Sequence, residues 1–125
     1  MNTLAEDLIL PTPYPWPQED LVLIRSAYRR LLRAMRHADI SQEEKKEIRK
    51  AFEFALTYHE SQRRKSGEPY ITHPLEVARI CFEEMGLGYK SVISAILHDV
   101  VEDTPATLGQ VEQIFGPKIS RIVDG

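Results

Sequence analysis

The sequence has a single cysteine, no apolar run that approaches the roughly 20 residues of a membrane span, and no excess of positive charge. One cysteine, Cys81, cannot form an internal disulfide, so we expect a reducing compartment and a cytoplasmic protein. The start of the chain contains Glu6 and Asp7 but no nearby Lys or Arg, which is unlike a secretory signal. The formal net charge of -3 gives no general attraction to nucleic acid or to an anionic membrane, and we expect neither as a partner.

The chain also lacks the alternating pattern of strands, and almost all of it after residue 17 has the spacing of helices. Apolar residues recur at steps of three and four, as they do over residues 21–35. Capping-box spacings at Ser41–Glu44 and Thr107–Gln110 predict two helix starts. Further helices are expected from His73-Pro74, over about residues 90–101 and from Pro117. We therefore expect an all-α fold with five to six helices.

A proline-rich segment precedes the helices. Residues 11–17 read Pro-Thr-Pro-Tyr-Pro-Trp-Pro, and alternating prolines exclude a helix or a central strand. We expect an extended surface arm packed by Tyr14 and Trp16, with a proline-motif ligand as the alternative. The length of 125 residues fits one small domain, so the expected organisation is an arm at 1–17 and a helical domain at 18–125.

The sequence predicts the start, the buried face and the end of the helix that follows His73-Pro74. Proline suits the first helical position, which puts His73 at or near the N-cap. Four apolar residues are expected to face the core, and the cysteine among them is expected to be an ordinary core residue: Val77, Ile80, Cys81 and Met85. Gly86 or Gly88 is expected to end the helix.

Four ionisable side chains gather near the end of the helix expected over 90–101. His98 and Asp99 are adjacent and about 100° apart around the helix axis, so one cation can touch both. Such a nitrogen and oxygen set suits a divalent ion such as Mn²⁺, Fe²⁺ or Zn²⁺. Glu102 and Asp103 follow four residues later on the same face, where clustered carboxylates are costly unless a cation compensates them. The alternative is a helix end whose acids point to water.

A basic segment lies in the loop before His73. Three consecutive cations at 63–65 form a local positive spot in a chain of negative net charge. Backbone N–H groups in the turn at Gly67 can face an anion, and an arginine offers a planar face to a base and a fork to a phosphate. The alternative is a basic loop that is simply solvated.

Two long motifs, in this order, resemble the N-terminal hydrolase domain of RelA/SpoT homologues, the enzymes that make and degrade the alarmone (p)ppGpp. The motifs are Arg64-Lys65-Ser66-Gly67-Glu68-Pro69-Tyr70-Ile71-Thr72-His73-Pro74 and Leu97-His98-Asp99-Val100-Val101-Glu102-Asp103-Thr104. The resemblance covers about residues 45–125. It implies an HD-type helical bundle that binds Mn²⁺ and removes the 3′-pyrophosphate of (p)ppGpp.

The resemblance also implies roles for particular residues, carried over by position. The implied metal ligands are two histidines and an aspartate: His73, His98 and Asp99. The implied acidic pair positions or deprotonates the attacking water: Glu102 and Asp103. The implied nucleotide-binding residues, the first of them lying against the guanine, come from the basic loop: Arg64, Lys65 and Ser66.

The sequence departs from the family pattern in two places. Where the family usually reads His-x-Gly-Gln, this chain has His59-Glu60-Ser61-Gln62, so Ser61 replaces a glycine. The family's fourth metal ligand, an aspartate in a motif like Ala-x-Asp-Arg-x-His-Asn, is not reached before Gly125. We therefore expect the front portion of a hydrolase domain, weak or inactive by itself. Apolar surface left without its covering helices would favour a homodimer.

Two other functions stay open from the residues alone. A generic HD phosphohydrolase would act on another nucleotide, and a panel of ppGpp, dGTP and cyclic dinucleotides would separate the two enzymes. A non-catalytic regulatory module would bind ppGpp without metal and leave it intact. Calorimetry with and without Mn²⁺ would reveal such a module.

Overall fold

The computed structural model describes residues 14–125, so most of the arm expected at 1–17 lies outside the described part. The described residues form helices α2 Gln18–Ala34, α3 Gln42–Tyr58, α4 Thr72–Glu83, α5 Tyr89–Asp103, α6 Leu108–Phe115 and α7 Pro117–Asp124. Between residues 14 and 125 there is no strand, only an isolated bridge between Arg63 and Pro69. The expected all-α class is confirmed. None of these helices combines the length and apolarity needed to cross a bilayer.

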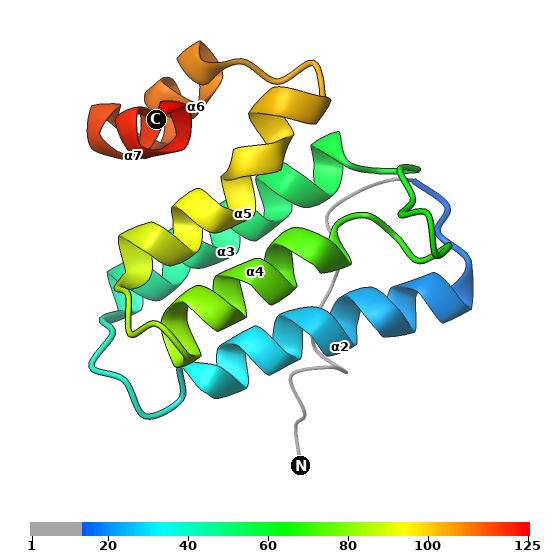
Figure 1. The fold of residues 1–125 in the computed structure, drawn as a ribbon, viewed down its shortest axis with the longest axis horizontal. Coiled ribbons are helices and arrows are strands. Elements are labelled where there is room, and N and C mark those ends of the chain that lie inside the picture. Colours follow the sequence, from blue (N-terminus) through cyan, green and yellow to red (C-terminus); the bar gives the residue numbers. More distant parts are fainter. Residues whose placement is uncertain (1–13) are drawn as a thin grey trace.

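Helices α2 to α5 form the main body, with α4 between α2 and α5 (Figure 1). α3 packs on α5, while α6 and α7 pack on each other and α7 also packs on α5. A short turn joins α4 to α5, and the two helices therefore run antiparallel. This arrangement brings the start of α4 next to the end of α5 (Figure 1).

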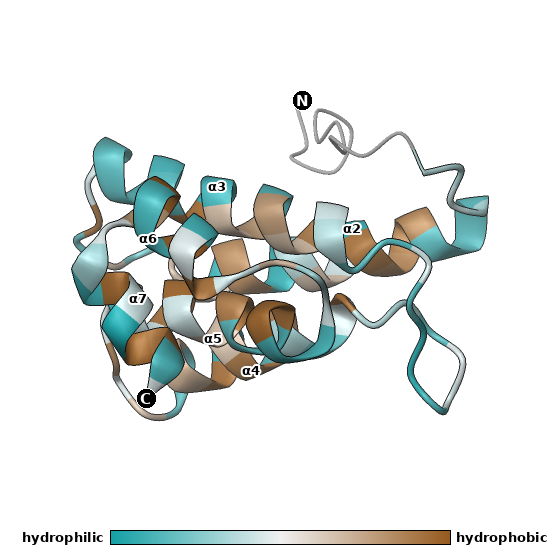
Figure 2. Cartoon of the chain, turned by 90° about the horizontal axis from the view of Figure 1, so that it is seen from above, coloured by the Kyte–Doolittle hydropathy of each residue, from teal (hydrophilic) through white to brown (hydrophobic). Residues whose placement is uncertain are grey.

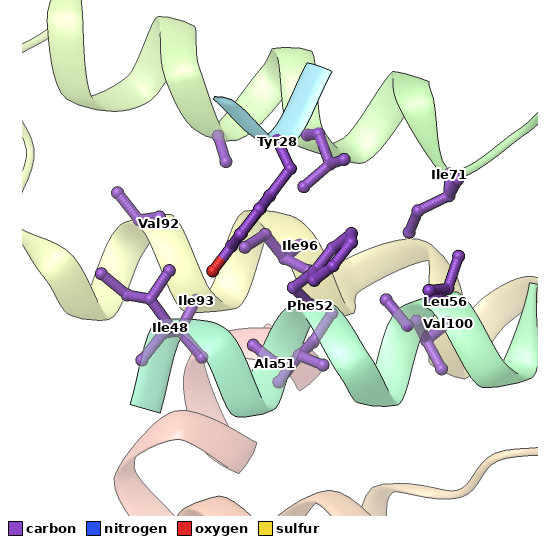
Figure 3. Close-up of a cluster of buried hydrophobic side chains, with 14 of the residues drawn as sticks. Tyr28, Ile48, Ala51, Phe52, Leu56, Ile71, Val92, Ile93, Ile96 and Val100 are labelled. Carbon is purple, nitrogen blue, oxygen red and sulfur yellow. The ribbon is translucent and has the colours of Figure 1, made fainter. Parts of the chain in front are cut away.

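The core is built from the apolar stripes that the spacing predicts. Tyr28 of α2 and Phe52 of α3 stack with ring centroids 4.1 Å apart and an interplanar angle of 13°. Figure 3 shows Ile96 and Val100 of α5 close to Phe52, and all three side chains are fully buried. Figure 2 shows hydrophilic residues along the outer side of α3, where its charged sequence faces solvent. Burying each large apolar side chain contributes about 1.5–3 kcal/mol.

Both predicted capping boxes are present. The Glu44 amide donates to Ser41 Oγ, and the Ser41 amide donates to Glu44 Oε1, each at 3.1 Å. Thr107 and Gln110 make the equivalent reciprocal pair at the start of α6. These bonds satisfy amides that have no partner inside a helix, so the chain enters α3 and α6 where the sequence indicates.

The described end of the arm packs as expected. Trp16 is 7% exposed, and its ring meets Tyr14 edge-on with centroids 4.7 Å apart. Just beyond, the buried carboxylate of Asp20 accepts from Arg63 at 2.5 Å, and Arg63 also donates to the Gly67 carbonyl at 2.8 Å. The start of α2 is therefore tied to the basic loop.

The start of α4 differs from the sequence prediction by a residue or two. The helix begins at Thr72, and Ile71 is its N-cap, so His73 lies inside the first turn and not at the cap. The Tyr70 carbonyl accepts from the His73 amide at 2.9 Å, which starts the helical bonding before Pro74. The proline still fits, because the first helical amides need no intrahelical acceptor.

The buried face of α4 was also placed wrongly by the sequence. Leu75 and Ala78 are fully buried. The four residues expected to face the core are half-buried or, for the last, 63% exposed: Val77, Ile80, Cys81 and Met85. α4 is covered by α2 on one side and α5 on the other, so its most buried stripe is set by both neighbours. The helix ends at Glu83, before either predicted glycine, and Gly86 takes a left-handed φ of 70° in the turn that follows.

The link between α3 and α4 contains a strained residue. Ser61 has a φ of 72°, a left-handed conformation that costs a residue with a side chain roughly 1–2 kcal/mol. Further along the link, Gly67 has a φ of 105°, where the absence of a side chain avoids strain. The link is closed by the Arg64 amide donating to the Glu68 carbonyl at 2.9 Å.

Substituting Ser61→Gly is expected to raise the free energy of unfolding by up to about 1 kcal/mol, because it removes the left-handed strain. Ser61 is exposed, so little packing is lost. The reciprocal variant Gly67→Ser is expected to lower the free energy of unfolding by about 1 kcal/mol. Urea denaturation measures both. A Ser61→Gly variant less stable than the parent would contradict the assignment of strain.

Candidate metal centre

Two helices bring the predicted ligands together. His73 lies in the first turn of α4, and the end of α5 lies beside it (Figure 1). His98 and Asp99 occupy adjacent positions in the second half of α5, and Glu102 follows in its last turn. Residues that are 25 or more apart in sequence therefore share one end of the α4–α5 pair.

The polar atoms of this group are close to one another. His73 Nε2 lies 3.9 Å from Asp99 Oδ2, and His98 Nε2 lies 3.9 Å from Glu102 Oε2. One ligand atom from each of His98, Asp99 and Glu102 lies within 4.8 Å of the others. The structure thus groups two of the three predicted ligands, His98 and Asp99, with Glu102, while the third, His73, approaches the group through Asp99 alone.

The group is open on one side. The side chains of His98 and Glu102 are 55% and 64% exposed, whereas that of Asp99 is only 19% exposed. A cation or substrate can therefore reach the group from the solvent side of α5, and Asp99 forms the least exposed part of the group.

The donor set fits a divalent cation. Imidazole nitrogens combined with carboxylate oxygens suit Mn²⁺, Fe²⁺ or Zn²⁺. Two atoms that each bind one cation at roughly 2.2 Å are at most about 4.4 Å apart. The His73–Asp99 and His98–Glu102 separations of 3.9 Å lie below this limit. The atoms of His98, Asp99 and Glu102, which lie within 4.8 Å of one another, would draw slightly closer around a shared ion.

Tyr70 orients the central carboxylate. Its hydroxyl donates to Asp99 Oδ2 at 2.8 Å. Burial, together with the hydrogen bond and negative charge of Asp99, raises the pKa of Tyr70 to about 12. The hydroxyl therefore stays protonated at neutral pH and remains a donor. A donor fixed on one oxygen of a metal-binding carboxylate sets the direction of the other oxygen.

The two residues of the predicted acidic pair, Glu102 and Asp103, have different surroundings in the structure. Glu102 belongs to the group described above. Asp103, the last residue of α5, is exposed, and its backbone carbonyl accepts from Gln62 Nε2 at 3.1 Å. The two neighbours therefore differ in their surroundings, although both lie at the same end of α5.

The predicted nucleotide-binding residues lie together in the turn before α4. Arg64 pairs with Glu68 at 3.6 Å. The pKa of Glu68 is lowered, first by a hydrogen bond from the Ser66 side chain and also by the charge of Arg64. Lys65 is exposed between them. The structure groups these side chains with Glu68, and none of them belongs to the candidate metal group of His98, Asp99 and Glu102.

A cavity of about 400 Å³ adjoins the predicted ligands. Its polar lining includes His73, His98 and Asp99 together with Ser91 and Ser94, and apolar side chains of α4, α5 and α7 complete the lining. Cys81, expected as an ordinary core residue, is half-buried and lines this cavity. Cys81 therefore borders this cavity and is not enclosed by the core on all sides.

Sequence reasoning missed three residues that join the site to its surroundings. Tyr70 bonds Asp99 directly, while Gln62 and His59 are bonded to each other at 2.7 Å. All three are polar groups in or beside a turn that has no periodicity. The sequence did place all three within motifs that resemble those of the family, but the motifs do not reveal their hydrogen-bond partners.

A Tyr70→Phe variant is expected to bind Mn²⁺ about 10–100-fold more weakly, because it keeps the ring and removes the donor that fixes Asp99. The matched control is Tyr58→Phe, which removes a hydroxyl that accepts from Gln110 in another part of the fold. Electron paramagnetic resonance of free Mn²⁺ during a titration gives both affinities. A Tyr70→Phe affinity within twofold of the parent would show that Tyr70 does not orient a ligand.

The sequence matches a known family and several known proteins. Residues 51–125 match the model of the family described as HD domain. Over 80 residues the chain is 51% identical to the bifunctional (p)ppGpp synthase/hydrolase SpoT of Escherichia coli strain K12, covering 64% of this chain and 11% of that protein. Over 79 residues it is 44% identical to the guanosine-3′,5′-bis(diphosphate) 3′-pyrophosphohydrolase of Aquifex aeolicus, covering 63% of this chain and 11% of that protein.

A third relative is the GTP pyrophosphokinase rsh of Brucella melitensis biotype 1, 46% identical over 78 residues, which are 62% of this chain and 10% of that protein. The chain therefore spans about a tenth of the length of the curated relatives it matches. The resemblance to RelA/SpoT homologues is confirmed, and HD domains bind divalent metals. The chain belongs to the HD domain family.

Proposed function

We propose that this chain carries the site for metal-dependent removal of the 3′-pyrophosphate from (p)ppGpp, with GDP or GTP and pyrophosphate as products. The observation that carries the proposal is the grouping of His98, Asp99 and Glu102 within 4.8 Å at the end of α5. The HD domain match over residues 51–125 contains both this group and the basic loop, and relatives named for (p)ppGpp hydrolysis match 63–64% of the chain. The proposed cation is Mn²⁺, held by His73, His98 and Asp99.

The cation, when bound, supplies Lewis-acid polarisation of the phosphoryl group and activation of water. The chain's own residues supply the proton acceptor. Glu102 lies among the ligands and is 64% exposed, so its carboxylate can take the proton of an attacking water. The water oxygen bonds to the phosphorus attached at the 3′ position, the bond from that phosphorus to O3′ breaks, and O3′ gains a proton. Asp103, exposed at the end of α5, adds negative charge that favours proton transfer.

The basic loop supplies the nucleotide contacts in this proposal. Arg64 is 40% exposed and is paired with Glu68 at 3.6 Å, which restrains its guanidinium within the basic loop. A guanidinium plane stacks on a nucleobase, and Lys65 with the Ser66 hydroxyl can bind phosphate oxygens. In this proposal the basic loop binds the nucleotide while its 3′-pyrophosphate reaches the end of α5. A free thiol at Cys81 agrees with a reducing compartment, and we keep the cytoplasm as the proposed location.

Single-turnover assays with the chain in excess over ppGpp test the function. With Mn²⁺ we expect release of pyrophosphate, because the proposed ligands His73, His98 and Asp99 hold the cation beside Glu102. Asp99→Asn is expected to abolish the release, since it removes a charged ligand at the centre of the group. Asp39→Asn, which neutralises an exposed carboxylate between α2 and α3, is the control and should keep the parental rate.

The products separate the proposal from its rivals. Release of pyrophosphate from ppGpp, with GTP left intact, supports it. Equal cleavage of ppGpp and dGTP would indicate a general nucleotide phosphohydrolase. Metal-independent binding of intact ppGpp would indicate a regulatory module and would contradict the proposal.

A further inference from the structure

Four hydrogen bonds converge on Gln62, between the end of α3 and the basic loop. Its backbone amide donates to the His59 carbonyl at 3.0 Å, and its backbone carbonyl accepts from the Tyr70 amide at 2.9 Å. Its side chain contacts His59 Nδ1 at 2.7 Å and the Asp103 carbonyl at 3.1 Å. One residue therefore joins the end of α3, the base of the basic loop and the end of α5.

The partners of Gln62 determine the direction of each side-chain bond. The Asp103 carbonyl can only accept, so the amide NH₂ of Gln62 faces it, and Gln62 Oε1 faces His59. Oε1 can only accept, so His59 Nδ1 carries the proton. His59 is fully buried, and its Nε2 has no hydrogen-bond partner within residues 14–125. Burial lowers the pKa of His59, which agrees with a neutral ring that fixes the Gln62 amide in one orientation.

The bond to Asp103 satisfies a carbonyl that the helix itself leaves open. The last four carbonyls of a helix have no intrahelical donor, and Asp103 is the last residue of α5. Gln62 therefore caps the helix end that carries Glu102 and Asp103. The preceding residue, Ser61, takes a left-handed φ of 72°, and this turn directs Gln62 toward α5. The strained conformation of Ser61 therefore occurs at the point where the chain turns from α3 toward the end of α5.

We propose that Gln62, held by its hydrogen bond to His59, is a positioning residue that sets the basic loop against the carboxylate end of α5. This role rests on the proposed function. In that function, Gln62 sets the distance between the nucleotide-binding residues Arg64–Ser66 and the group around Asp99. Gln62 does not touch the reacting atoms. Its loss should leave the metal-binding group intact and let the loop move away from it.

The variant Gln62→Met keeps the length of the side chain and removes both of its hydrogen bonds. The matched control is Gln110→Met, because Gln110 also makes two kinds of side-chain bond, to the Thr107 amide at 2.8 Å and to the Tyr58 hydroxyl at 3.1 Å, away from the site. A third variant, Gln62→Glu, still accepts from His59 but cannot donate to the Asp103 carbonyl, so it breaks only the bond to α5.

Two readouts need no catalysis. Trypsin cleavage after Arg63, Arg64 and Lys65 reports opening of the loop, and we expect at least a tenfold faster cleavage in Gln62→Met and Gln62→Glu than in the parent. Mn²⁺ affinity is expected to stay within twofold of the parent in both. Gln110→Met is expected to leave both quantities near the parental values, even though its stability falls.

The catalytic readout uses single-turnover hydrolysis of ppGpp. We expect the half-saturating ppGpp concentration to rise about tenfold in both Gln62 variants, with a smaller change in the maximal rate. Equal changes in loop cleavage for Gln62→Met and Gln110→Met would overturn the inference and leave only a general loss of stability. A parent chain that leaves ppGpp intact would remove the proposed function, while the trypsin and Mn²⁺ results would still support or overturn the link between the loop and α5.

Discussion

α4 and α5 run antiparallel and pack against each other, with Leu75 and Ala78 of α4 and Ile93, Ile96 and Leu97 of α5 fully buried. This apolar contact places the first turn of one helix beside the last turns of the other. The 3.9 Å approach of His73 to Asp99 is a consequence of that packing. The polar group therefore owes its geometry to burial of apolar side chains, which is the dominant favourable contribution to folding. α2 and α3 cover the two outer sides of the pair and keep it fixed.

Much of this architecture could be predicted from local patterns. Periodicity and capping boxes predict the helices, because both signals lie within a few residues of each other, as Ser41 and Glu44 do. The clustering of ionisable side chains around His98 could also be predicted, since a step of four residues returns to the same helix face. His73 entered through resemblance to RelA/SpoT homologues. Its distance from Asp99 depends on packing and could not be read from spacing.

Contacts between distant parts of the chain could not be predicted. Tyr70 and Asp99 are 29 residues apart, and Gln62 and Asp103 are 41 apart, so no local rule pairs them. The prediction of the buried face of α4 was wrong for a related reason. The two neighbouring helices, and not the pattern within α4, determine that Leu75 is covered while Met85 is exposed. The substitution of Ser61 for a glycine was visible, but its left-handed φ shows why that position favours glycine.

We propose that the end of the α4–α5 pair binds a divalent cation through Asp99 and its neighbours. Anomalous diffraction at the manganese absorption edge, from crystals soaked in MnCl₂, tests it most directly. The account predicts a strong anomalous peak in contact with His98 and Asp99, next to His73. A map with no peak there, or with peaks only at other carboxylates such as Glu43 and Glu44 at the start of α3, would contradict it.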